Sequence, residues 1–504
     1  MDKQYKDFMN EISQDELYAG LLAYGLFSEK LPPAFTSKPF FDYCQATNPI
    51  FQGDAHRYIY YENMRNINVP RPLAIPNPMA YQQLCLFLRD NWPALQAHFI
   101  SKTQNHSFRV SRIHIRKMYQ RPELFQMNYS NWRVDGSPEV DVSFGKRYMV
   151  KADISSCFPS IYTHAMSWAL VSKTVAKQQR NDKNVWFNKL DALTRRMTHD
   201  ETHGLLIGPH VSNLLAEIIL TTIDNDLKNW QYLRAIDDYA CFVDTYEDGQ
   251  RFLTELGAAL RSYDLSLNHK KTEILELPLA VTEQWQRKLN LLPLKTPYGK
   301  TDFILVRSYL DHAIELMHSC KENAAILKYA VKVLAGQELT ENAKEYCAKT
   351  ILSLSMLYPY LVTILDEYIF SKFCKHCPTH DCIKQYSVRI LKNGLETNNY
   401  EQCAYALFFA IKYGFQIHEF EVTKAINSKD CIFLLLSFLY ARENSQNADI
   451  KTLKKFAREL AQDHETFDQY WLFLYETLPQ SDLKSDWKPL KNAGISFIKP
   501  LSQW

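Results

Sequence analysis

Two short apolar segments that carry carboxylates constrain this 504-residue chain more than any other feature. The segment RYMVKADISS predicts a strand that ends at Asp153, and LRAIDDYACFV predicts two strands joined by a tight turn at Asp237 and Asp238. Each pattern alone is common, because Asp favours hairpin turns and many buried strands end in a carboxylate. Together they predict a sheet that gathers three carboxylates at one end.

Such a group of carboxylates suits nucleotidyl transfer. Polymerases hold two divalent ions about 3.5–4 Å apart, one on the attacking hydroxyl and one on the leaving pyrophosphate. Mg²⁺ prefers oxygen ligands and commonly takes one or two protein carboxylates together with substrate phosphates. We therefore expect Mg²⁺, or Mn²⁺, at Asp153, Asp237 and Asp238.

Periodicity divides the chain into three parts. Residues 1–145 are mixed, and FRVSRIHIRKMY alternates apolar and basic residues like a half-buried strand. Residues 146–320 alternate strands and helices, as in an α+β sheet domain. In residues 321–504 apolar residues recur three and four apart with short loops, which predicts stacked helical hairpins.

Composition excludes few functions. The formal net charge is +2, so a nucleic-acid groove would need locally clustered basic residues. No apolar run approaches the roughly 20 residues needed to span a bilayer. The N-terminus has no apolar signal region, and eleven Cys without one suit a reducing compartment. We expect a cytoplasmic protein that is not inserted in a membrane.

Four segments in a fixed order resemble the motifs of reverse transcriptases. DISSCF, at 153–158, is similar to motif A, and GLLIGPHVSNLLAE, at 204–217, is similar to motif B. AIDD, at 235–238, resembles motif C, and LSLNHKKTEIL, at 265–275, resembles motif D. The resemblance implies fingers and a palm, and a nucleic-acid polymerase activity of the reverse-transcriptase type.

Further phrases narrow this resemblance to the abortive-infection reverse transcriptases of bacteria and prophages, of the AbiK type. They are the Tyr-Thr-His run after motif A, KQQRN at 177–181 and DETHG at 200–204. This family implies an all-α HEAT-like domain in place of a thumb, anti-phage defence, homo-oligomers, and untemplated DNA synthesis primed by a protein hydroxyl. The product would be single-stranded DNA covalently attached to the protein.

The resemblance also assigns roles to individual positions. It places Asp153 and Asp237 as metal ligands, Asp238 as a weaker one, and Ile154 at the metal and the nucleotide. Phe158 takes the steric-gate position that excludes a ribose 2′-hydroxyl, although an ordinary core residue is the alternative. Lys271 takes the position of a general acid for pyrophosphate, although a solvated Lys is equally compatible with the sequence.

Gly204 and Gly208 of motif B correspond to positions where the backbone approaches the nucleotide; ordinary turn glycines are the alternative. Three departures from the family pattern surround the site. Ala235 replaces the motif C Tyr, Ile207 replaces the motif B Gln, and Pro209-His210 replaces Ser-Pro. Because these positions normally help to align template, primer and nucleotide, their loss argues against ordinary templated synthesis.

Basic and thiol-rich clusters give weaker signals. Arg112 and Arg116 are candidates for triphosphate contacts from the fingers. A second basic group could grip a phosphate backbone or form a solvated helix face: Lys173, Lys177, Arg180 and Lys183. The Cys374–Cys382 segment has thiols and imidazoles at short spacing, but no second CxxC pair follows, so buried free Cys is the stronger interpretation.

Three functions remain open at this point: an untemplated, protein-primed polymerase, a templated reverse transcriptase of the retron or group II intron kind, and a non-catalytic nucleic-acid-binding scaffold. A Tyr hydroxyl can act as the primer if a metal lowers its effective pKa. Seven Tyr of the first 61 residues are candidates, and the sequence does not choose among them: Tyr5, Tyr18, Tyr24, Tyr43, Tyr58, Tyr60 and Tyr61.

Overall fold

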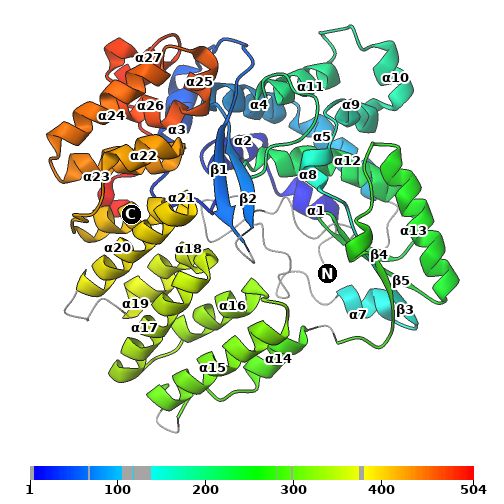
Figure 1. Cartoon of the computed structure of the whole chain (residues 1–504). Helices are drawn as coiled ribbons and strands as arrows, with labels where there is room; N and C mark the ends of the chain where they lie inside the picture. The colour runs from blue at the N-terminus through cyan, green and yellow to red at the C-terminus, as the bar shows by residue number, and fades with distance from the viewer. Residues whose placement is uncertain are drawn as a thin grey trace.

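A computed structural model describes residues 5–65, 69–104, 117, 138–280, 282–296, 299–373 and 380–504. In these ranges the chain forms an N-terminal helical segment with a hairpin, a four-stranded sheet with its helices, and a long helical region (Figure 1). The predicted α+β class with an all-α C-terminal part is confirmed. The basic strand predicted around Arg109 and the Cys374–Cys377 segment lie outside the described residues.

The N-terminal segment packs helices around one hairpin. The hairpin pairs β1 (Ile59–Met64) with β2 (Pro70–Ile75) in antiparallel register. Ile59 and Tyr61 are buried while Tyr60 between them is 53% exposed, as the two-residue period of a strand requires. The helices are α1 (Tyr5–Asn10), α2 (Gln14–Leu22), α3 (Lys38–Thr47), α4 (Pro78–Asp90) and α5 (Trp92–Thr103).

The second sheet has the strand order β4-β5-β3-β6, and all its pairs are antiparallel. Val150 and Ala152 of the inner strand β3 are buried, whereas Lys151 between them points to the exposed face. The strands are β3 (Tyr148–Asp153), β4 (Tyr232–Ala235), β5 (Asp238–Val243) and β6 (Glu273–Glu276). The predicted strand, turn and strand around Asp237 are therefore confirmed.

The helices of this middle region cover the sheet and link its motifs. Helix α13 packs on β3 and β5, and α12 packs on α5, α9 and α13. The helices are α7 (Pro138–Ser143), α8 (Cys157–Ser160), α9 (His164–Val171), α10 (Lys173–Gln178), α11 (Trp186–Arg196), α12 (Val211–Asp226) and α13 (Tyr246–Arg261), with a short 3-10 turn η2 (His269–Lys271) before β6.

The C-terminal region is helical throughout its described residues. Its helices are α14 (Gln284–Asn290), α15 (Phe303–Ser319), α16 (Ala324–Ala335), α17 (Glu341–Leu357), α18 (Val362–Leu365), α19 (Ser371–Phe373), α20 (His380–Thr397), α21 (Tyr400–Tyr413), α22 (Val422–Ser428), α23 (Cys431–Glu443), α24 (Asn447–Leu460), α25 (His464–Gln469), α26 (Trp471–Thr477) and α27 (Trp487–Asn492). Helix α15 packs on α16 and α17, so helical packing starts before residue 320, the predicted end of the palm.

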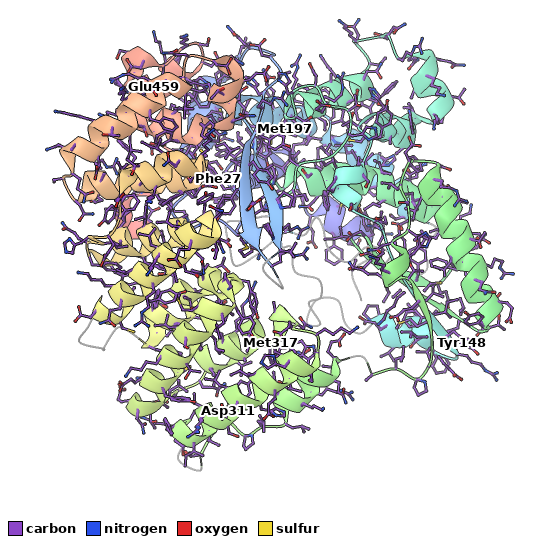
Figure 2. The ribbon with its side chains drawn as sticks, viewed as in Figure 1. Phe27, Tyr148, Met197, Asp311, Met317 and Glu459 are labelled. Carbon is purple, nitrogen blue, oxygen red and sulfur yellow. The ribbon has the colours of Figure 1, made fainter. Side chains whose placement is uncertain are left out.

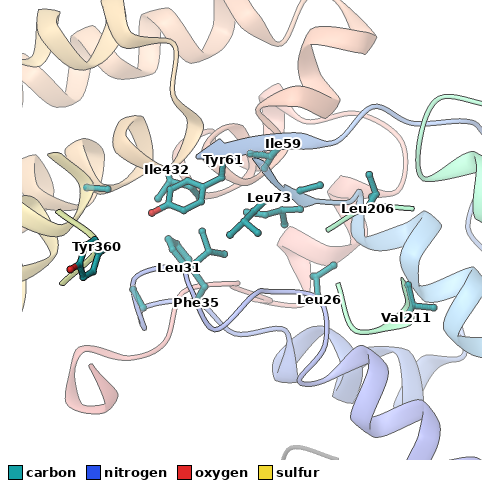
Figure 3. Close-up of a cluster of buried hydrophobic side chains, with 14 of the residues drawn as sticks. Leu26, Leu31, Phe35, Ile59, Tyr61, Leu73, Leu206, Val211, Tyr360 and Ile432 are labelled. Atoms are coloured by element: carbon teal, nitrogen blue, oxygen red, sulfur yellow. The ribbon is translucent and has the colours of Figure 1, made fainter. Parts of the chain in front are cut away.

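The two ends of the chain share one hydrophobic core. Tyr61 and Leu73 of the hairpin lie beside Ile432 of α23 (Figure 3). The Phe27 ring, beside the hairpin in Figure 2, lies 6.4 Å from the Trp471 ring between centroids. Phe35 forms an antiparallel bridge with Ile498. The N-terminal segment is thus packed into the C-terminal helices as well as against α11 and α12 of the middle region. Among the described residues, no helix is long and apolar enough to cross a membrane.

Candidate active site

Strand register brings the three predicted carboxylates together. Asp153, the last residue of β3, is paired with Asp238, the first residue of β5. Between β4 and β5 the chain turns through Ile236, at φ 62°, and Asp237. The backbone N–H of Ile154 donates to the carbonyl of Asp237 at 3.0 Å, which fixes the turn against the end of β3. A strand end and a hairpin turn therefore form one site.

The segment after α13 supplies donors to Asp153. Lys271 Nζ donates to Asp153 Oδ2 at 2.8 Å, and Asn268 Nδ2 donates to Oδ1 at 2.8 Å. The Asn268 backbone N–H also donates to the Asp153 carbonyl at 2.7 Å. Asp153 is 5% exposed, whereas the Lys271 side chain is 64% exposed. The ammonium group therefore reaches from the surface and neutralises a buried carboxylate.

Burial and neighbouring carboxylates raise the proton affinity of both carboxylates of the turn. Burial, and then the charge of Asp237, raises the pKa of Asp238 to about 6. Burial, and then the charge of Asp153, raises the pKa of Asp237, while Lys271 and Arg71 act in the opposite direction. The hydrogen bond to Asp153 is the main cause that raises the pKa of Lys271. A divalent cation would relieve this repulsion, and carboxylate oxygens are the ligands that Mg²⁺ prefers, so the residues fit such an ion.

A fully buried ion network lies directly behind the turn. Arg234 of β4 is 0% exposed and donates to Asp224 Oδ2 at 2.6 Å and to Glu217 Oε2 at 3.1 Å, both on α12. Its Nη1 also donates to the Ile236 carbonyl at 3.0 Å. Tyr5 of α1 donates to Glu217 Oε1 at 2.7 Å. Burial alone would lower the pKa of Arg234, but Asp224 and Glu217 outweigh it and leave that pKa raised.

An open cleft of about 370 Å³ borders Asp238, the first residue of β5. Asp238 and Lys271 line it, and so does Ala235, where the related motif has a Tyr. Glu139, Lys151, Leu233 and Ala240 line its other parts. Small-molecule sites commonly have volumes of about 300–1,000 Å³, so a nucleotide-sized ligand is compatible with this cleft.

The motif B loop is joined to motif A and to the hairpin. Leu205 N–H donates to the Phe158 carbonyl at 2.8 Å, and Ala74 N–H of β2 donates to the Ile207 carbonyl at 2.8 Å. Gly204 and Gly208 have φ values of 94° and 125°. A Cβ at Gly208 would lie 3.2 Å from the Ala74 carbonyl oxygen, so both the backbone conformation and the close approach favour glycine.

The structure places some of the other predicted site residues and leaves others outside its described ranges. Phe158 is half-buried and packs against the main core. Lys173 and Lys177 lie exposed on α10, but α10 ends at Gln178, so Arg180 and Lys183 follow the helix rather than share its face. Arg112 and Arg116 lie outside the described residues. Within the described part of the chain, Arg71 of β2 is a cation whose charge reaches Asp237.

Sequence reasoning overlooked Asn268 and Arg234. Asn268 stands three residues before Lys271 in motif D, and this spacing on a tight turn was an available signal. Arg234 interrupts an apolar strand, and Glu217 and Asp224 interrupt the apolar helix AEIILTTID. Charged residues inside continuous apolar segments are seldom buried unless they are paired, so these three were candidates for one ion network.

Comparison with known proteins agrees with this geometry. Residues 99–296 match the model of the reverse transcriptase (RNA-dependent DNA polymerase) family. No curated protein matches the sequence. The chain thus carries a reverse transcriptase domain, which places its central part in the class of nucleotidyltransferases.

Several solved structures of telomerase are similar at low identity. Apo telomerase from Candida tropicalis is 12% identical, with a TM-score of 0.32, over 74% of this chain and 72% of that chain. A form of it truncated from the C-terminal domain is 13% identical, with a TM-score of 0.28, and the match covers 45% of this chain and 51% of that one. Candida albicans telomerase, in complex with a fragment of telomeric RNA, is 11% identical, with a TM-score of 0.29, over 84% of this chain and 65% of that chain.

Proposed function

We propose that this chain is a DNA polymerase that joins deoxynucleotides without a template, starting from a Tyr hydroxyl of the protein, and that it acts in abortive infection against phage. The observation that carries the polymerase part is the register of β3 and β5. It opposes Asp153 to Asp238 and holds Asp237 in the adjoining turn. The abortive-infection part rests on the phrases around motifs A and B given above.

The chain's own residues have distinct tasks in this proposal. Asp153, Asp237 and Asp238, with Ile154 beside them, would hold Mg²⁺ or Mn²⁺, and such an ion would supply activation of the attacking hydroxyl and charge stabilisation for the departing pyrophosphate. Phe158 lies under the sugar and excludes a 2′-hydroxyl. Lys271, which donates to Asp153 Oδ2, would be the group that gives a proton to the pyrophosphate. Gly204 and Gly208 let the motif B backbone approach the nucleotide.

The surroundings of the site support synthesis without a template. Ala235 leaves open the part of the cleft where a motif C Tyr would pack. The Ile207 carbonyl accepts a hydrogen bond from the Ala74 N–H of the hairpin, and its side chain has no amide that could bind a base. A templated enzyme needs groups that align template and primer, and these two positions do not provide them.

The structure narrows the search for the priming hydroxyl. Tyr5 and Tyr61 are buried and donate to Glu217 and Glu401, and Tyr18 is buried and accepts from Gln82. Tyr60 is exposed, and three others are half-buried: Tyr24, Tyr43 and Tyr58. We therefore rank Tyr60 first, because its side chain is exposed and its hydroxyl donates to the neighbouring Glu62 side chain at 3.1 Å rather than to a buried group.

This proposal includes the partners that the family resemblance implies. The substrates are deoxynucleoside triphosphates, the product is single-stranded DNA attached to the protein, and the protein assembles as a homo-oligomer in the cytoplasm. Cross-linking and light scattering of the purified protein test the assembly.

The decisive experiment incubates purified protein with Mg²⁺ and labelled deoxynucleotides, without primer or template. Label that remains with denatured protein, and shifts after protease and after nuclease, supports the proposal. Asp237→Asn with Asp238→Asn should abolish it, because the metal ligands are lost, while circular dichroism stays unchanged. Extension by the double variant would refute the metal assignment. Label only after RNA is added would establish a templated enzyme instead.

Phe158→Ala tests nucleotide selection. Removal of the ring should relax discrimination against ribonucleotides by about 10–100-fold, since one filled contact in a binding pocket is worth about 1–3 kcal/mol. The ratio of kcat/KM for deoxynucleotide and ribonucleotide measures it. Phe187→Ala, which empties a buried position on α11, is the control for packing loss. Equal discrimination in wild type and Phe158→Ala would return Phe158 to the core.

A further inference from the structure

Three side chains outside the polymerase site converge where the N-terminal segment meets the C-terminal helices. They are His56, from the loop before β1, and His464 and Asp468 of α25. One ligand atom from each lies within 4.8 Å of the others. His464 and Asp468 are four residues apart, so they share one face of the helix. Parts of the chain separated by about 400 residues thus present imidazole and carboxylate groups to one point.

Two members of this group are held firmly. The Asp468 side chain is 3% exposed, and its oxygens accept from Asn77 Nδ2 at 3.1 Å, Arg57 N–H at 3.2 Å and His56 Nδ1 at 3.0 Å. The His56 backbone N–H donates to the Arg196 carbonyl at 2.8 Å, and its carbonyl accepts from His199 N–H at 2.8 Å. A carboxylate and an imidazole are therefore pre-positioned by contacts on several elements.

His464 completes the group without a hydrogen bond to it. Its Nδ1 lies 3.9 Å from Asp468 Oδ2, beyond hydrogen-bond range, and its side chain is 68% exposed. Its ring stacks on that of His56 with centroids 5.8 Å apart and planes at 29°. Ligands of a tetrahedral zinc ion, with bonds of about 2.0–2.2 Å, lie about 3.3 Å from each other. The observed 3.0 and 3.9 Å bracket that value.

The group opens onto a cavity of about 150 Å³. His56 and His464 line it, together with Asp54, Asp482 and Asp486, against a single Lys, Lys484. The excess of carboxylates favours a cation there. The space is large enough for a metal-bound water as a fourth ligand.

We propose that His56, His464 and Asp468 bind one Zn²⁺ ion per chain, with the fourth coordination position directed to this cavity. Two imidazoles and one carboxylate suit a borderline divalent metal better than Mg²⁺, which prefers oxygen. A His56–Asp468 hydrogen bond alone would need neither His464 nor the cavity. Bound zinc ties α25 to the loop before the hairpin, and so fastens the C-terminal helices to the segment that adjoins the polymerase site.

The test measures zinc on the full chain carrying Asp237→Asn and Asp238→Asn, so that the polymerase carboxylates do not contribute. Competition with a chromophoric chelator gives the affinity and stoichiometry, and Co²⁺ in place of zinc gives a visible spectrum of a tetrahedral site. We expect one Zn²⁺ per chain and a rise in Tm on zinc addition. Loss of even an outer-shell partner costs about 10–100-fold in metal affinity, so His464→Ala should cost at least about 100-fold.

His464 is exposed, so its loss leaves the fold intact, and His418→Ala, at an exposed His elsewhere in the helical region, is the matched control. Affinity unchanged by His464→Ala, or no zinc bound at micromolar concentration, would overturn the proposal. Zinc that is lost in Cys377→Ser but kept in His464→Ala would place the ion in the Cys374–Cys382 segment and also overturn it.

Discussion

Two acidic clusters lie back to back at the turn between β4 and β5, and they differ in how their charge is balanced. Behind the turn, Glu217 and Asp224 are fully buried and surround the guanidinium of Arg234. In front of it lie Asp153, Asp237 and Asp238; Asp238 lines an open cleft, and the exposed Lys271 donates to Asp153 from the surface.

The difference fits a structural role for the rear cluster and the metal site proposed for the front cluster. A buried carboxylate without a partner is costly, so the rear cluster carries its own permanent cation and three neighbouring elements are fixed around it. Burial raises the pKa of Asp224 in the rear cluster, and Arg234 is the main cause that opposes this shift; in the front cluster the charge of Asp237 instead adds to burial and raises the pKa of Asp238 to about 6. Incomplete balance beside an open cleft is what a site for an exchangeable metal requires.

Arg234→Met removes the cation of the rear cluster, and we expect it to have the largest effect on folding stability. It leaves Glu217 and Asp224 buried without a counter-charge, and such a loss costs about 3–5 kcal/mol of folding free energy. It also removes the donor to the Ile236 carbonyl, so Asp237 loses its support. Urea unfolding at pH 7 measures the first effect, and polymerisation at a temperature where the variant is folded measures the second.

Two further variants test whether the loss of stability in Arg234→Met comes from the buried charges. Arg251→Met removes an exposed Arg paired with Asp248, and should change stability by less than about 1 kcal/mol. Adding Glu217→Gln and Asp224→Asn to Arg234→Met removes the stranded charges and should restore part of the stability. A single Arg234→Met variant as stable as wild type would show that the rear cluster does not need its cation.

Lys271→Met tests the role of the exposed cation in the front cluster. The loss of this exposed cation should lower metal-free stability by less than about 1 kcal/mol. It should raise the apparent affinity for Mg²⁺, because a competitor for Asp153 is gone. The rate should nevertheless fall by about 10²–10⁴-fold if Lys271 is the general acid.

Opposite changes in Mg²⁺ affinity and in kcat identify the role of Lys271. Titration of activity against Mg²⁺ measures both, and Lys300→Met, which removes an exposed Lys paired with Glu338, is the control. A variant with wild-type kcat would assign Lys271 to charge balance alone.

The smallest expected effect is on the pH dependence of folding stability. Because the folded state raises the pKa of Asp238 from 3.8 to about 6, folding favours its protonated form. In metal-free protein, protonated Asp238 therefore adds to the free energy of unfolding below about pH 4. This stabilisation is lost as the pH rises towards 6. Asp238→Asn should flatten that part of the curve, as measured by urea unfolding with a chelator at several pH values. Mg²⁺ affinity of the wild type should rise over the same interval, since the ion binds the ionised form. An identical pH curve for the variant would contradict the raised pKa.

Sequence patterns located the front cluster because catalysis ties it to local signatures. A strand end at Asp153, a turn at Asp237 and Asp238, and a Lys after an amphipathic helix are each visible within about ten residues. The α+β class and the helical C-terminal part also followed from local periodicity. The rear cluster was only partly visible: its charged residues interrupt apolar segments, but their pairing depends on how α12 packs behind β4.

The sequence by itself thus determined the order of elements, the carboxylates of the site and the class of chemistry, because those depend on short-range pattern and turn preference. Only the tertiary structure decided that Asn268 holds Asp153, that Arg234 supports the Asp237 turn, and that His56 meets His464 and Asp468. Contacts of this kind join residues tens to hundreds of positions apart. They arise when one hydrophobic core closes around several segments, and no local period encodes which polar groups are then left facing each other.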